Sequence, residues 1–83
     1  MAKVVIYSKT YCPFCVRAKS LLSSKGVDFE EIMVDSKPEL FAELKAKTGM
    51  MTVPQIFIND ELVGGYTELA ALDDSGELDP KLA

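Results

Sequence analysis

A pair of cysteines at the junction between a strand pattern and a helix pattern is the feature that most constrains this chain. Residues 4–7, VVIY, form a short β-branched apolar run, which is typical of a central strand covered on both faces. The motif Cys12-Pro13-Phe14-Cys15 follows, and from Pro13 the apolar residues recur with helical spacing. Because proline is well tolerated at the first helical position, we expect Cys12 to be the N-cap residue of this helix.

The middle of the chain predicts a second strand and a second helix. Residues 27–34 read as the strand, although their apolar positions fall out of phase, which leaves a bulge or a weak edge strand as alternatives. Ser36 and Glu39 form a capping-box pattern ahead of an apolar helical stripe. Gly49 stands where a left-handed residue would end that helix.

The last third predicts a hairpin followed by a final helix. Residues 59–60, Asn-Asp, both tolerate the left-handed backbone conformation of a tight turn, and they separate two short apolar runs. The glycine pair 64–65 breaks the second run. We expect Thr67 to cap a last helix that stops near Gly76 and Pro80.

The resulting order of elements is β-α-β-α-β-β-α, which belongs to the α/β class. The first two strands need a helical crossover and should be parallel, whereas the hairpin is antiparallel, so we expect a four-stranded mixed sheet flanked by three helices. A chain of 83 residues with 48% apolar and 27% charged residues predicts a single globular domain over residues 1–83.

The opening residues and the net charge argue against a membrane partner and a nucleic-acid partner. The opening residues have no apolar core of a signal peptide, and no 18-residue apolar run occurs, so we expect a cytoplasmic protein without a membrane partner. The net charge of −4 argues against a nucleic-acid partner. Residues 1–25 nevertheless contain five basic and no acidic side chains, which favours a thiolate and a small anionic ligand, although solvated surface lysines are the simpler alternative.

The cysteine pair admits three interpretations: a structural disulfide, a metal site or a redox centre. A reducing cytosol disfavours a lasting disulfide. Zinc requires four ligands, and the chain has two cysteines and no histidine, so we expect no metal site. A Cys-x-x-Cys motif in a βαβ setting is typical of redox proteins. The amides and the positive end of the helix favour the thiolate of Cys12, which predicts Cys12 as the nucleophile and Cys15 as the resolving thiol.

Three motifs in register resemble those of the dithiol glutaredoxins, which have the thioredoxin fold. They are the Cys12–Cys15 motif, the segment Thr52-Val53-Pro54 and the stretch Gly64-Gly65-Tyr66-Thr67-Glu68. The resemblance covers essentially the whole chain, and the element order of that family agrees with the order above. It implies a groove beside Cys12 that binds the glutathione part of a mixed disulfide.

The resemblance also assigns residues to the parts of glutathione. Lys9 would face the glycine carboxylate, the backbone of Thr52 and Val53 would pair with the cysteinyl part, and Thr67 with Glu68 would receive the γ-glutamyl end. Pro54 matches a cis-proline that shapes the groove. The remaining expected contacts of the groove are Tyr11, Phe14, Gly65 and Tyr66. For Phe14 and Tyr66, packing in the protein is an equal alternative.

The implied activity is that of a glutathione-disulfide oxidoreductase with glutathione as reductant and no tightly bound cofactor. Its expected partners are glutathionylated proteins, disulfide-containing proteins such as ribonucleotide reductase, and indirectly glutathione reductase, with the chain acting as a monomer. Two alternatives remain open. One is a thioredoxin-like reductant supplied by a flavoenzyme, and the other is an iron–sulfur carrier dimer that uses Cys12 from each subunit and two glutathiones.

Overall fold

The first apolar run lies at the centre of the sheet in the computed structural model, which describes residues 2–83. The four strands are β1 (Val4–Ser8), β2 (Glu30–Met33), β3 (Gln55–Ile58) and β4 (Glu61–Gly64). The helices are α1 (Pro13–Ser24), α2 (Pro38–Thr48), α3 (Tyr66–Asp74) and α4 (Leu78–Leu82). The predicted order is confirmed, with one additional short helix at the end.

The strands follow the order β2-β1-β3-β4 in a mixed sheet. β1 pairs in parallel with β2 and antiparallel with β3, while β3 and β4 form the antiparallel hairpin. Asn59 and Asp60 turn that hairpin with φ of 52° and 66°, as their tolerance of this conformation predicts. β2 covers only four of the eight residues expected, and it lies at the edge of the sheet, so the weak-edge alternative is the correct one.

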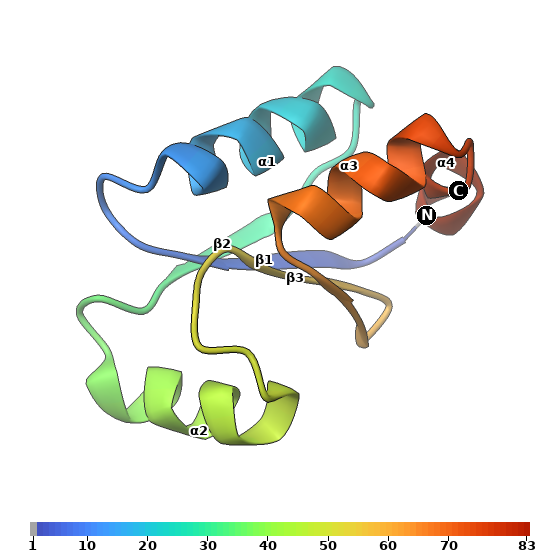
Figure 1. Ribbon diagram of the computed structural model, residues 1–83. Coiled ribbons are helices and arrows are strands. Elements are labelled where there is room, and N and C mark those ends of the chain that lie inside the picture. Colours follow the sequence, from blue (N-terminus) through green and yellow to red (C-terminus); the bar gives the residue numbers. More distant parts are fainter. Residues whose placement is uncertain (1) are drawn as a thin grey trace.

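The helices divide between the two faces of the sheet, with α1 and α3 on one face and α2 on the other (Figure 1). The α1/α3 face holds the larger group of buried apolar side chains, which includes Ile6, Leu22, Ile56, Leu69 and Leu78. On the α2 face only Val34, Phe41 and Leu44 are buried, with Tyr7, Val53 and Phe57 packed against them. The sheet therefore separates a large core from a small one.

The N-cap residues predicted for two helices, Ser36 and Thr67, are wrong. α2 begins at Pro38 after Lys37, which provides no side-chain cap, so Ser36 lies one residue too early to cap the helix. α3 begins at Tyr66, which places Thr67 inside the first turn, while Gly65 is the N-cap residue. Pro38 occupies the first position of α2, and Glu68 rather than Thr67 supplies the side chain that caps α3.

The predicted stop of the last helix near Gly76 agrees with the structure, whereas the prediction that Pro80 also marks the end of helical structure is wrong. α3 ends at Asp74, and Gly76 turns the chain with φ of 78°. Pro80 lies in the first turn of α4, where its missing N–H breaks no helical hydrogen bond. Leu78 and Leu82, one helical turn apart, bury their side chains in the large core, and the carbonyl of Leu82 accepts a hydrogen bond from the Ala2 amide at 3.4 Å.

None of the helices within residues 2–83 has the length and apolar character needed to cross a membrane.

Candidate active site

Cys12 lies at the N-terminus of α1, as the sequence predicts. Its extended backbone, with φ of −105°, makes it the N-cap residue, and Pro13 begins the helix. The Cys12 Sγ accepts a hydrogen bond from the Cys15 amide at 3.2 Å. This contact and the positive end of the helix dipole place partial positive charge beside the Cys12 sulfur. The side chain is half-buried, so the sulfur can be reached from outside.

Cys15 lies on the inner side of α1 and is 1% exposed. Burial raises the pKa of the Cys15 thiol to about 12, with a further contribution from its hydrogen bond to Cys12. Cys15 therefore keeps its proton at neutral pH while Cys12 is unmodified. The two thiols are free, one reachable and one protected. This difference is the one that a division into a nucleophile and a resolving thiol requires.

A groove of about 290 Å³ lies beside Cys12. Its lining comes from the start of α1, from the loop before β3 and from the start of α3, and comprises Phe14, Met50, Thr52, Val53, Pro54, Gly65, Tyr66, Thr67 and Glu68. The Cys12 Sγ lies 3.9 Å from the carbonyl oxygen of Val53, which joins the thiol to the groove. The Val53–Pro54 peptide bond is cis.

Most of the expected glutathione-binding residues thus come together, although they lie on three separate segments. The rings of Phe14 and Tyr66, which both line the groove, form a tilted pair with centroids 6.4 Å apart. Met50 also lines the groove and was missed, because its position before the Thr52–Pro54 segment carries no motif of its own.

The start of α3 fixes the carboxylate of Glu68 at the groove. The Gly65 amide donates a hydrogen bond to Glu68 Oε1 at 2.7 Å, so Glu68 caps its own helix. The side chain of Glu68 lies over Gly64, whose φ is 124°. A Cβ at Gly64 would lie 2.8 Å from that side chain, so this position requires glycine for space as well as for conformation.

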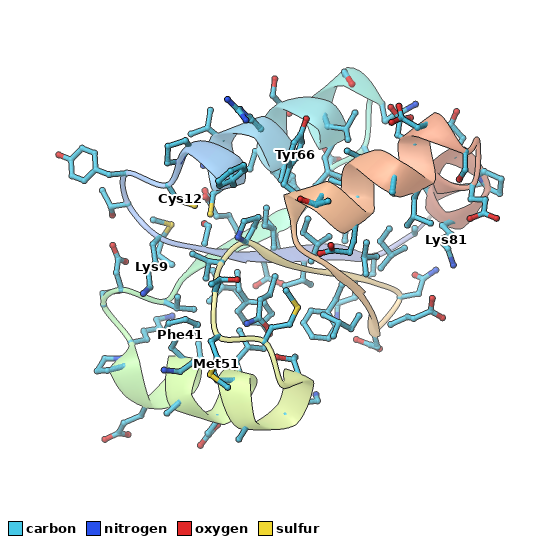
Figure 2. All side chains as sticks on the ribbon, in the orientation of Figure 1. Lys9, Cys12, Phe41, Met51, Tyr66 and Lys81 are labelled. Atoms are coloured by element: carbon cyan, nitrogen blue, oxygen red, sulfur yellow. The ribbon has the colours of Figure 1, made fainter. Side chains whose placement is uncertain are left out.

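Two expected residues do not line the groove. Tyr11 has a left-handed backbone with φ of 59°, and its side chain is 98% exposed. Lys9 extends toward α2, where its Nζ lies 4.4 Å from the centre of the Phe41 ring (Figure 2). The sequence gives no sign of this contact, because it joins residues from two distant segments.

A larger cavity of about 390 Å³ lies between α2 and the sheet. Apolar side chains such as Tyr7, Leu44 and Phe57 line it, with charged side chains at its margin. Neither cysteine belongs to the lining, so this cavity offers no thiol chemistry.

Comparison with known proteins identifies the family of this chain. The sequence model of the glutaredoxin family matches residues 4–63. A glutaredoxin of Pseudomonas aeruginosa is 55% identical over 83 residues, which cover all of this chain and 99% of the relative. The chain belongs to the glutaredoxin family. Glutaredoxin 3 of Escherichia coli K12 is 51% identical over 82 residues, which cover 99% of both chains.

A solved glutaredoxin confirms the fold. The crystal structure of a buckwheat glutaredoxin–glutathione complex superposes with a TM-score of 0.93 at 33% identity and covers 98% of this chain and 76% of the buckwheat chain. The predicted thioredoxin-like fold and the predicted family are therefore confirmed. Membership of the glutaredoxin family makes this chain a thiol oxidoreductase, and Cys12 and Cys15 are its two cysteines.

Proposed function

We propose that this glutaredoxin uses glutathione to reduce both glutathione mixed disulfides and protein disulfides through Cys12 and Cys15. The observation that carries the proposal is the position of the Cys12 Sγ, which accepts a hydrogen bond from the Cys15 amide and lies 3.9 Å from the Val53 carbonyl of the groove. A sulfur bound to Cys12 would therefore bring its attached peptide next to the groove. The buckwheat relative, whose structure is that of a glutathione complex, supports glutathione as that peptide.

The groove can hold the tripeptide along its length. Thr52 is exposed and Val53 half-buried where they line the groove, and the backbone of Val53 would pair with the cysteinyl part. Unpaired amides at the start of α3 suit the γ-glutamyl carboxylate, since helix N-termini bind anions. Thr67 and Glu68 lie at the same place, and the Glu68 carboxylate suits the α-ammonium group.

Reduction of a glutathione mixed disulfide requires Cys12 alone. The Cys12 thiolate attacks the glutathionyl sulfur, a bond forms between the two sulfurs, and the target protein leaves as a thiolate that takes up a proton. The thiolate of a second glutathione then attacks the glutathionyl sulfur on Cys12. Oxidised glutathione leaves, and the Cys12 thiolate is regenerated.

Reduction of a protein disulfide also requires Cys15. Cys12 first forms a mixed disulfide with the target and releases one target thiol. Cys15 then loses its proton and attacks the Cys12 sulfur, which releases the second target thiol and forms the Cys12–Cys15 disulfide. Two glutathiones reduce this bond and leave as oxidised glutathione. The raised pKa of Cys15 keeps it out of the first attack.

The same proposal defines the setting in which the chain works. Residues 1–83 act as one domain and as a monomer in the cytoplasm, with no tightly bound cofactor. The targets are glutathionylated proteins and disulfide-containing proteins such as ribonucleotide reductase, and glutathione reductase restores the reductant. Its contribution to electron transport would be the transfer of two electrons from two glutathiones to one disulfide.

The test is a Cys15→Ser variant assayed on two substrates. We expect the variant to keep most of the activity on a glutathionylated peptide and to lose at least about tenfold on a protein disulfide, because only the second reaction needs a resolving thiol. Cys12→Ser, which lacks the nucleophile, should be inactive on both substrates. Equal losses on the two substrates for Cys15→Ser would contradict the assigned roles.

A second assay distinguishes glutathione from thioredoxin reductase as the reductant of the Cys12–Cys15 disulfide. Oxidised wild-type protein should be reduced by glutathione and not by a thioredoxin reductase with NADPH. Efficient reduction by the flavoenzyme alone would favour the thioredoxin-like alternative.

A further inference from the structure

A hydroxyl, a carboxylate and an ammonium group form one chain of hydrogen bonds that links β1, β2 and α1. Ser8, at the end of β1, is 0% exposed, and its Oγ donates a hydrogen bond to Glu31 Oε2 at 2.7 Å. The Lys19 Nζ donates a second hydrogen bond to the same oxygen, also at 2.7 Å. Glu31 belongs to β2 and Lys19 to α1, so the carboxylate holds the ammonium group on the side of α1 that faces the sheet.

Cys15 lies on the same side of α1, one helical turn before Lys19. Residues four apart in a helix are neighbours on its surface, with Cβ atoms about 5–6 Å apart. Cys15 is buried, as is Ala18, which precedes Lys19. The ammonium group of Lys19 therefore lies near the buried thiol, and the bond to Glu31 keeps it from extending into solvent.

The groups around Cys15 act on its pKa in opposite directions. Burial raises this pKa most, and the hydrogen bond and the charge of Cys12 raise it further. A backbone hydrogen bond from Lys9 and the positive charge of Lys19 lower it. Among these groups, Lys19 is the side-chain cation that favours the Cys15 thiolate, since an opposite charge nearby stabilises the ionised form.

The elements packed against this side of α1 differ in the charge that they present. β1 contributes the neutral hydroxyl of Ser8, and α3 contributes Tyr66 and apolar side chains such as Leu69. β2 contributes the Glu31 carboxylate, whose pKa is lowered by its hydrogen bonds from Lys19 and Ser8. Glu31 therefore stays ionised at neutral pH and continues to hold Lys19.

We propose that Lys19 stabilises the thiolate that Cys15 forms in the resolving step, and that the Glu31 carboxylate, anchored by Ser8, holds the ammonium group in place. The proposal rests on the proposed function, since it assumes that Cys15 attacks Cys12. Lys19 is a positioning residue, because it acts through Cys15 and forms no bond to the target.

The step that Lys19 favours is the following one. The Cys15 thiol gives its proton to solvent, and its thiolate attacks the Cys12 sulfur of the mixed disulfide. A bond forms between the two protein sulfurs, the bond from Cys12 to the target sulfur breaks, and the target leaves as a thiolate. The first attack, by Cys12, does not depend on this proton.

The experiment follows both attacks in one reaction with the aromatic disulfide of thionitrobenzoate. One equivalent is mixed with reduced protein, and the absorbance of the released thiolate is recorded at a series of pH values from about 6 to about 10. Attack by Cys12 releases one thionitrobenzoate, and attack by Cys15 then releases the second and forms the Cys12–Cys15 disulfide. The rate of the second release measures the resolving step, and the first release is the internal reference.

Lys19→Met should slow the second release about twofold to fourfold at neutral pH and leave the first release unchanged. A higher pKa leaves less thiolate at Cys15, although the greater nucleophilicity of the more basic sulfur offsets part of the loss. For the same reason the pH dependence of the second release should move to higher pH. Lys19→Arg keeps the positive charge and should behave as wild type.

Glu31→Gln separates the charge of Lys19 from the ion pair as a structural contact. The amide oxygen of glutamine can still accept hydrogen bonds from Ser8 and Lys19, and the negative charge that offsets Lys19 is gone. The second release should therefore be no slower than in wild type. Lys47→Met, at an exposed residue of α2, removes the same charge as Lys19→Met far from this network and should change neither release.

The proposal fails if Lys19→Met slows both releases equally or slows neither. It also fails if Glu31→Gln or Lys47→Met slows the second release as much as Lys19→Met does. If wild type releases only one thionitrobenzoate, Cys15 does not resolve the mixed disulfide and the proposed function fails, which is a different outcome from a failure at Lys19 alone.

Discussion

At the scale of single residues, the burial of Cys15 determines when this thiol can react. Burial is the largest cause of its raised pKa, and the hydrogen bond to Cys12 is the second. A Cys12 sulfur bound in a mixed disulfide is no longer a thiol or thiolate, so the contribution of Cys12 to the pKa of Cys15 is lost while that of burial remains. We therefore expect the pKa of Cys15 to fall at the step in which, under the proposed mechanism, Cys15 attacks Cys12.

The same raised pKa predicts a loss of stability at alkaline pH. The Cys15 thiol titrates near 9.0 in the unfolded chain and near 12 in the folded protein. Between these values the unfolded state binds fewer protons, so the free energy of unfolding decreases as pH rises from about 9 toward about 12. Below pH 9 this contribution is fully present and constant.

Urea unfolding at a series of pH values can measure this effect. Other groups also titrate in this range, so the relevant quantity is the difference between wild type and Cys15→Ala, in which this thiol is absent. The free energy of wild type should decrease more steeply with pH than that of the variant. Parallel curves would show that the titration of Cys15 is not linked to folding.

The sequence predicts the structural role of a residue well when that role depends on the neighbouring residues in the chain. Cys12 as N-cap follows from Pro13 and the helical pattern alone, and the hairpin turn follows from Asn59 and Asp60. It does not predict the contacts of Phe41 with Lys9 and Lys45, because these depend on how α2 lies against the loop before α1.

At the scale of elements, the ends of helices depend on their surroundings more than on capping preferences. Thr67 favours an N-cap position, yet the backbone at Gly65 begins α3 and Glu68 reaches back to it. The sequence does not predict α4, because Pro80 indicates the end of a helix, whereas a proline in the first turn is tolerated. The spacing of Leu78 and Leu82 by four residues is the signal that could have revealed α4.

The buried side chain of Leu78 predicts that α4 is part of the folded core. Leu78 is 0% exposed and belongs to the large group of buried apolar residues. Leu78→Ala should lower the free energy of unfolding by about 2–5 kcal/mol, because it removes buried methyl groups and leaves a cavity. Chemical denaturation of the variant measures this loss. Glu77→Ala, at the exposed residue before Leu78, should change stability by less than about 0.5 kcal/mol.

At the scale of the whole molecule, the two faces of the sheet are unequally protected. The face under α1 and α3 buries nine apolar side chains, whereas the α2 face buries three. Local opening follows the amount of buried apolar surface. Because Phe41 and Leu44 of this small cluster belong to α2, we expect α2 to be the less protected helix.

Native-state hydrogen exchange should reveal this inequality. The amides of α2 should exchange through local openings, at least about tenfold faster than those in the middle of α1, which should require global unfolding. The measurement compares exchange rates of the two helices in reduced protein. Equal protection of α1 and α2 would show that the small core unfolds only together with the large one.

The hydrogen bond between Ala2 and Leu82 has a consequence for how the molecule can be attached to others. It brings the two ends of the chain together, and Figure 1 and Figure 2 show both ends at the opposite side of the molecule from Cys12. A tether, a surface or a fused protein joined at either end would therefore leave the thiol facing outward. Two copies joined by a short linker would keep both reactive ends open to separate targets.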